Sequence, residues 1–85
     1  MYVHIGKEII IPSDEIITIL DLEKMLEKEN LEDILKKLKL EDNIINISEG
    51  NNKSLILIKK DENVIGYITN ISSQTIAKRI GKEII

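Results

Sequence analysis

Runs of β-branched residues at both ends of the chain limit what it can fold into. Isoleucine accounts for twenty of the 85 residues, and most of these stand in short runs separated by glycine, asparagine or charged residues. β-branched side chains lose χ1 freedom in helices and pack well on a pleated sheet, so these runs predict strands. A chain of this length rarely divides, and we expect one domain spanning residues 1–85.

The first twelve residues predict a β-hairpin. Apolar and polar residues alternate over positions 2–5, the stretch Gly6-Lys7-Glu8 forms a turn, and three isoleucines follow at positions 9–11. Short apolar runs on either side of a glycine-containing turn are typical of paired antiparallel strands. Pro12 cannot donate to a strand ladder, so the second strand ends there or lies at an edge.

Residues 16–20 are a candidate third strand, with a helix as the competing interpretation. The helix would begin at a Ser13 N-cap, followed by acidic first-turn residues, and would run to Met25. Three isoleucines and one threonine within four positions favour the strand.

The middle of the chain contains the clearest helix. Leucine and isoleucine at positions 31, 34, 35 and 38 recur at helical spacing. Asn30 is a suitable N-cap, acidic residues occupy the first turn, and lysines occupy the last, as the helix dipole favours. A shorter helical piece over residues 21–29 leads into this amphipathic helix.

The second half of the chain returns to strand patterns. Short apolar runs at positions 44–47, 54–58 and 64–69 predict three more strands, the last two joined as a hairpin. A short C-terminal helix over residues 72–80 follows, and Gly81 stands where a helix ends. Together these elements predict an α+β fold with a predominantly antiparallel sheet.

The hexapeptide IGKEII occurs twice, at Ile5–Ile10 and again at Ile80–Ile85. The residues before the two copies differ, and the first copy falls in a strand and turn whereas the second ends a helix. We interpret the repeat as a coincidence in an isoleucine-rich chain rather than a duplicated site. The tail Lys82–Ile85 remains a candidate to pair with a strand edge in its own or a neighbouring subunit.

The residues that carry chemistry do not assemble into a catalytic set. The chain lacks cysteine, and its one histidine, His4, is a poor metal site by itself. Neither Gly-Lys pair has the further glycines of a phosphate-binding loop. The adjacent acidic pairs fall at helix ends and turns, where solvated acids are ordinary. We therefore expect no enzyme activity, no metal and no cofactor.

Net charge is −3, which does not favour a free-standing DNA-binding domain. Any such binding needs local basic positions repeated over several subunits, and Lys53, Lys78 and Arg79 are the candidate phosphate contacts. The helical cluster Lys36-Lys37-Lys39 is interpreted as a solvated face. No membrane span or leader is evident, so a cytoplasmic protein is expected.

Self-association is expected from the apolar content. The chain is 42% hydrophobic although it is short, so its isoleucine-rich strands are expected to bury a face between subunits of a homo-oligomer.

Several stretches, in this order and spacing, resemble a known family. They are the opening MYVHIG, the isoleucine-rich strand with Asp21, the Gly50–Ser54 turn, and the ending ISSQTIAKR. The chain resembles the small bacterial extracellular-matrix regulators RemA and RemB over roughly two thirds of its length. The chain looks more similar to RemB in three stretches: the Tyr2-x-His4-x-Gly6 opening, the apolar run that begins with Lys53-Ser54, and the Ser72-Ser73-x-Thr75-x-x-Lys78-Arg79 ending.

The resemblance implies a regulator of transcription of biofilm matrix genes that binds double-stranded DNA, with RemA-like members forming ring-shaped homo-oligomers. The sequence departs from the family pattern at two places that carry arginines in RemA-like proteins. Asp14-Glu15 stands at one and Asn51-Asn52-Lys53 at the other. A carboxylate or amide in place of a guanidinium removes attraction for phosphate. The alternative function is therefore an oligomeric protein-interaction or scaffold module, with a protein partner and no direct DNA binding.

Overall fold

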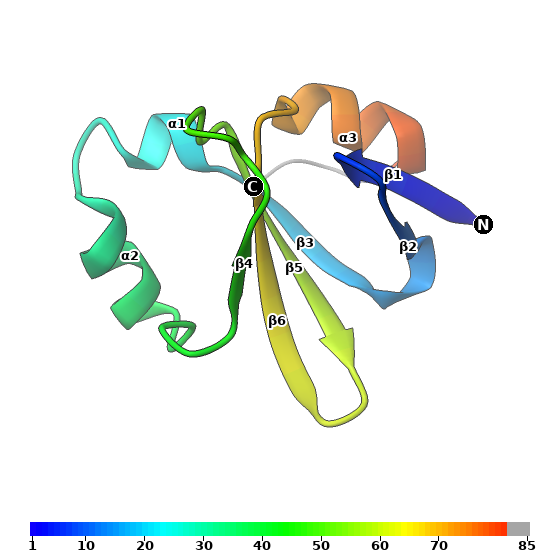
Figure 1. Cartoon of the computed structure of the whole chain (residues 1–85), viewed down its shortest axis with the longest axis horizontal. Helices are drawn as coiled ribbons and strands as arrows, with labels where there is room; N and C mark the ends of the chain where they lie inside the picture. Colours follow the sequence, from blue (N-terminus) through cyan, green and yellow to red (C-terminus); the bar gives the residue numbers. More distant parts are fainter. Residues whose placement is uncertain (82–85) are drawn as a thin grey trace.

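The computed structural model of the protein describes residues 1–81 (Figure 1). Over this range the fold has six strands, three α-helices and one turn of 3₁₀ helix. The elements in chain order are β1 (Tyr2–Gly6), β2 (Ile9–Pro12), a 3₁₀ turn (Ser13–Glu15), β3 (Ile16–Asp21), α1 (Leu22–Met25), α2 (Leu31–Lys37), β4 (Ile44–Asn46), β5 (Ser54–Lys60), β6 (Asn63–Thr69) and α3 (Ser73–Ile80).

Strands β3, β5, β6 and β4 form one sheet in that order, and β1 and β2 form a separate hairpin. The predicted α+β class and predominantly antiparallel pairing are confirmed, since within residues 1–81 only β4 runs parallel to its neighbour, β6. This parallel pair was not predicted. Because β3 and β4 then run in the same direction, the chain between them must cross back along the sheet, and α1 and α2 provide that crossover.

The predicted strand after Pro12 is confirmed as β3, and the competing long helix is not formed. Ser13–Glu15 makes a single 3₁₀ turn without a side-chain cap. The short helical piece is shorter than predicted: α1 covers only Leu22–Met25, with Asp21 Oδ1 accepting from the Lys24 amide at 3.2 Å. The Glu27 and Lys28 amides donate to carbonyls three residues earlier, as in a 3₁₀ helix, so the α-helix ends here.

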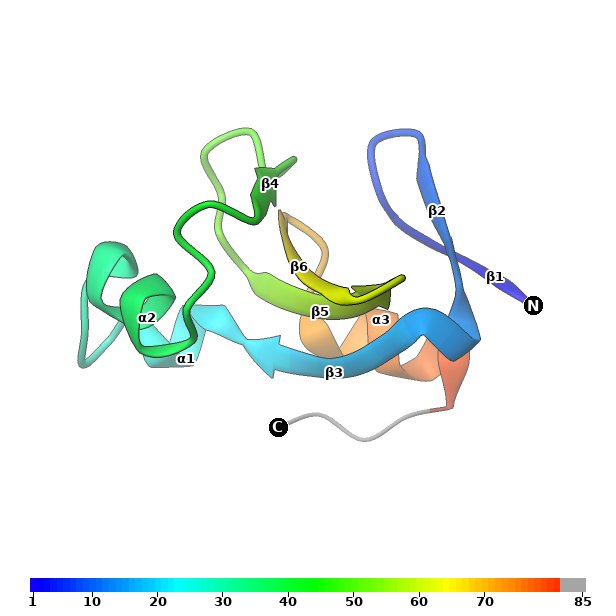
Figure 2. The same ribbon diagram turned by 90° about the horizontal axis from the view of Figure 1, so that it is seen from below.

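The helix that the sequence predicts most clearly forms as α2. Asn30 Oδ1 accepts a hydrogen bond from the Asp33 amide at 2.8 Å, which confirms Asn30 as the N-cap. The helix buries Ile34 completely, whereas its leucines are only partly buried. In Figures 1 and 2 the α1–α2 segment lies at one end of the molecule and the β1–β2 hairpin at the other.

Two apolar clusters pack against opposite faces of the sheet, because successive side chains of a strand alternate between its faces. Ile56 and Ile58 of β5 join the hairpin and α3 in one cluster. Leu55 of the same strand joins Leu22, Ile34 and Leu40 in the other. Strand β5 is therefore central to both clusters.

The described residues of the two copies of IGKEII lie in different elements, as predicted. Gly6 ends β1 with φ +145°, and a Cβ there would lie 2.5 Å from Thr69 Oγ1 and 2.9 Å from Ile47 Cδ1. Gly81 ends α3 with φ +69°, and its amide donates to the Ala77 carbonyl at 2.7 Å. The tail Lys82–Ile85, predicted to pair with a strand edge, lies outside the described residues.

Candidate nucleic-acid interface

Lys53 is fixed by its backbone at the start of β5. Its amide donates to the Thr69 carbonyl at 3.0 Å, and its carbonyl accepts from the Glu23 amide at 3.2 Å. The residue therefore joins the end of β6 to the beginning of α1. Its side chain is half-buried.

The loop that presents Lys53 is held by a small polar cluster. The buried Ser48 hydroxyl lies 2.6 Å from Asn46 Oδ1 and 2.5 Å from the Asn52 side-chain amide. A hydroxyl has one proton, so it can donate to only one of these two amide oxygens at a time. Gly50 follows with φ +90° and open space around it. The Asn46 and Asn52 side chains thus fix the path of this loop.

Lys78 and Arg79 lie on the exposed face of α3. The helix begins at Ser72, whose Oγ accepts from the Thr75 amide at 3.2 Å, and it buries Ile76 and Ala77 against the sheet. Arg79 is tied to the hairpin, since its Nη1 donates to the His4 carbonyl at 2.7 Å. The other guanidinium donors of Arg79 have no partner within residues 1–81 and face solvent.

The three predicted basic positions do not form one cluster within a chain. Ser54, next to Lys53, donates from Oγ to the Ile71 carbonyl at 2.6 Å and contacts Ser73 Oγ at 3.0 Å, which places Lys53 at the start of α3. Lys78 and Arg79 lie at the opposite end of that helix. At 1.5 Å per residue, Lys78 is about 7.5 Å further along the axis than Ser73. The structure therefore brings together Lys78 and Arg79 but not Lys53.

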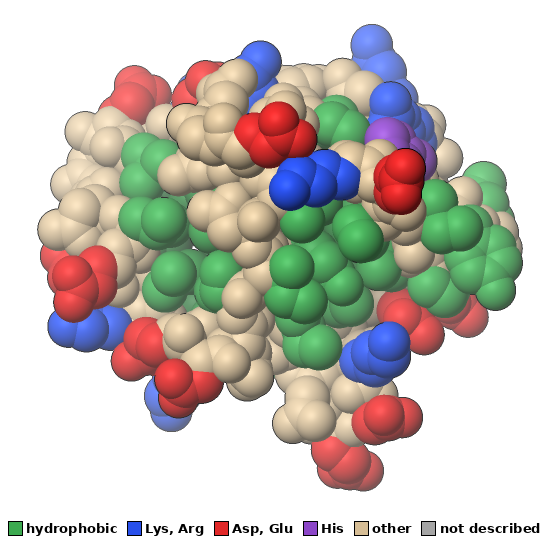
Figure 3. Space-filling model, viewed as in Figure 1, with side chains coloured by type: hydrophobic (Ala, Val, Ile, Leu, Met, Phe, Trp, Pro, Cys, Tyr) green, Lys and Arg blue, Asp and Glu red, His purple; other side chains and the backbone are tan. Residues whose placement is uncertain are grey.

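The structure adds two residues, His4 and Lys7, that the sequence reasoning did not assign to this surface. His4 is exposed beside Arg79, and its Nε2 is hydrogen-bonded to the carbonyl of Lys7 in the β1–β2 turn. We call His4, Lys7, Lys78 and Arg79 the basic corner, and Figure 3 shows basic side chains beside the histidine where β1 and α3 meet. The alternation of polar and apolar residues in β1 indicated that His4 is exposed. The contact of β1 with α3 joins residues more than seventy positions apart, so no short stretch of the sequence indicated it.

Other chemistry finds little support in the described part of the chain. Within residues 1–81, no group of three or more His, Cys, Asp or Glu side chains is placed to hold a metal ion. No helix in this range is long and apolar enough to cross a membrane. Asp14 is exposed and Glu15 half-buried in the turn between β2 and β3, at the other end of the hairpin strands from the Lys7 turn.

The described residues form an α+β domain with the basic corner at the contact of β1 with α3. A family model described as RemA-like, extracellular matrix regulatory protein A-like, matches residues 2–80. The chain belongs to this family of extracellular matrix regulatory proteins. Searches of the curated proteins and of the solved structures return no match.

Proposed function

We propose that this protein regulates transcription of extracellular matrix genes by binding double-stranded DNA as a homo-oligomer in the cytoplasm. The family match over residues 2–80 is the observation that supports a matrix-regulatory role. Within the family we place the chain nearer to RemB, because of its Tyr2-x-His4-x-Gly6 opening and its Ser72-Ser73-x-Thr75 ending.

The basic corner is the proposed phosphate contact. Lys78 and Arg79 are exposed, and the bond from Arg79 to the His4 carbonyl holds the guanidinium at the edge of the hairpin. A planar guanidinium whose other donors have no partner within residues 1–81 suits phosphate oxygens. One such corner contributes little at physiological salt, so several copies must act together, with Lys53 as a second contact on each subunit.

Exposed apolar side chains support self-association. Within residues 1–81, six large apolar side chains are more than one-third exposed: Met1, Tyr2, Ile10, Ile17, Ile45 and Val64. Ile45 stands next to the partly buried Tyr67 in the β4–β6 ladder. Figure 3 shows apolar side chains gathered over the sheet and the hairpin on one face. Covering such a surface with another subunit removes it from water.

Mobility-shift titrations of a long duplex over a range of salt concentrations test DNA binding. At low salt, replacing both Lys78 and Arg79 with Ala should weaken binding about tenfold or more and flatten the salt dependence. The matched control is Lys36→Ala with Lys37→Ala, which removes the same charge from α2 and should change affinity less than about twofold. No retardation by the unaltered protein at low salt would exclude direct DNA binding.

Light scattering at micromolar concentration tests the oligomer separately. A monomer would contradict self-association, whereas an oligomer that Ile45→Lys dissociates would support the apolar face as the contact. Circular dichroism of the variant confirms that the exposed substitution leaves the fold intact.

The alternative function is a protein-interaction module with no direct DNA binding. It is favoured by Asp14 and Glu15, and by asparagines in the loop before Lys53, at places where the family carries arginine. Under this alternative, pull-down from the native host recovers a partner protein, and nuclease treatment leaves the recovery unchanged.

A further inference from the structure

The negative charge of the chain is concentrated in one segment. Residues 21–42, which contain α1 and α2, carry eight acidic side chains and five lysines, a net charge of −3. This equals the net charge of the whole chain, because the remaining residues contain seven of each sign. The α1–α2 segment is also the part of the molecule most distant from the hairpin in both ribbon views (Figures 1 and 2).

An open hollow of about 410 Å³ lies on this segment. Its floor is formed by Leu31 and Leu35 of α2, which are only half-buried, and its rim by Glu32, Lys36 and Glu41. Most of the surface inside it is apolar. Figure 3 shows apolar side chains bordered by acidic ones at this end of the molecule.

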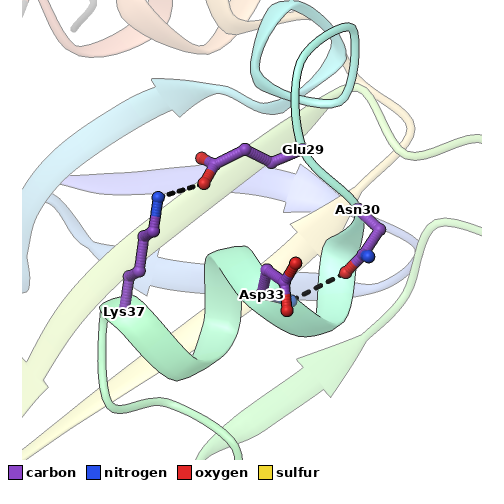
Figure 4. A network of polar contacts seen from close by, with 4 residues as sticks. All are labelled: Glu29, Asn30, Asp33 and Lys37. Carbon is purple, nitrogen blue, oxygen red and sulfur yellow. Dashed lines mark hydrogen bonds and ion pairs between the residues drawn. The ribbon is translucent and has the colours of Figure 1, made fainter.

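One acidic side chain at the rim of the hollow, Glu41, is neutralised by no ion pair within residues 1–81. Lys36 Nζ lies 3.2 Å from Glu32 Oε1, so these two rim charges cancel. Lys37 is bound to Glu29 in the connection before α2 (Figure 4), and that hydrogen bond, together with the carboxylate charge, raises the pKa of Lys37. Glu41 and the adjacent Asp42 are exposed and take part in no ion pair within residues 1–81.

We propose that this hollow docks a basic amphipathic helical segment of a partner protein. An aliphatic side chain of the partner enters between Leu31 and Leu35, and lysine or arginine next to it meets Glu41 and Asp42. Helix-in-groove contacts of this kind combine apolar anchors with complementary charge. The acidic rim repels nucleic acid and anionic lipid, which is why a basic protein segment is the occupant that fits. The proposal does not rest on DNA binding.

The test uses the full chain and a labelled synthetic helix with leucine at positions i and i+4 and lysine on its flanks. Fluorescence anisotropy should give a dissociation constant on the order of 100 µM, as suits a small contact surface. The methyl NMR signals of Leu31 and Leu35 should shift on addition. A peptide with glutamate in place of lysine should not bind.

Paired charge reversals distinguish peptide binding at this hollow from a general effect of the protein's net charge. Glu41→Lys with Asp42→Lys should weaken peptide binding about tenfold. The matched control, Asp61→Lys with Glu62→Lys, alters the exposed acidic pair in the β5–β6 turn and should change affinity less than about twofold. Circular dichroism establishes that both variants are folded.

Three results would overturn the proposal. They are equal weakening by both variant pairs, methyl shifts confined to residues outside the hollow, and a change of oligomeric state in the Glu41–Asp42 variant, which would show that a second copy of the chain occupies the surface. In mobility-shift titrations the same variant should bind DNA at least as tightly as the unaltered protein, because the reversal removes acidic repulsion. Loss of peptide binding with DNA binding retained therefore distinguishes failure of this site from failure of DNA binding.

Discussion

The two sides of the sheet are packed from different residues. The cluster beneath the hairpin and α3 is built of isoleucine and valine with one alanine, and it contains no leucine. The cluster beneath α1 and α2 is built mainly of leucine, with isoleucine at two of its five buried positions. Secondary structure alone does not account for this difference, since Leu55 lies on a strand whereas Ile34 and Ile76 lie on helices.

Charge differs between the same two sides. The hairpin side carries the basic corner, tied together by the hydrogen bond from Arg79 to the His4 carbonyl. The α1–α2 side carries the net negative charge and the hollow over Leu31 and Leu35. The small domain therefore offers two chemically distinct surfaces supported by one sheet, and either can be altered without touching the other.

The largest expected effect on the free energy of unfolding comes from truncating a buried β5 side chain in either cluster. Ile56 and Leu55 are adjacent, fully buried and directed to opposite faces. Ile56→Ala and Leu55→Ala should each lower the free energy of unfolding by about 2–5 kcal/mol, measured by urea denaturation. Because β5 belongs to both clusters, each variant should still unfold in one transition. Two resolved transitions would show that the sides are independent units.

A smaller effect is expected from the paired glycines of the repeated hexapeptide. Gly6→Ala places a Cβ against Thr69 and Ile47 at a φ that favours glycine, and should cost about 2–4 kcal/mol. Gly81→Ala meets open space and bears only the left-handed backbone cost of about 1 kcal/mol. Thermal unfolding of the two variants compares them directly. Equal destabilisation would mean that the contact at Gly6 relaxes without cost.

The smallest effect comes from the helix caps, one on each side. Asn30→Ala removes the cap of α2, and Ser72→Ala removes that of α3. Each should cost about 1 kcal/mol, and glycine at the same position only a few tenths. Thermal melts followed by circular dichroism measure both. A loss at Ser72 with none at Asn30 would indicate that α2 unravels before the global transition.

Local sequence signals predicted much of this fold. Four features could be predicted because each depends on residues only a few positions apart. They are the Gly6 turn, the β-branched run of β3, the Asn30 cap and the helix end at Gly81. The early end of α1 was missed, since its leucine and methionine continue at helical spacing while the backbone tightens after Met25. The basic positions were predicted one by one, but not their arrangement.

The sequence by itself determined the elements, the caps and the excess of acid in residues 21–42, because periodicity, capping chemistry and charge are local properties. Tertiary structure alone decided the parallel pairing of β4 with β6, the contact of Arg79 with the His4 carbonyl, and the separation of Lys53 from Lys78. These features join segments distant in the chain. They are set by which faces bury the most apolar surface together, a property that no short stretch of sequence carries.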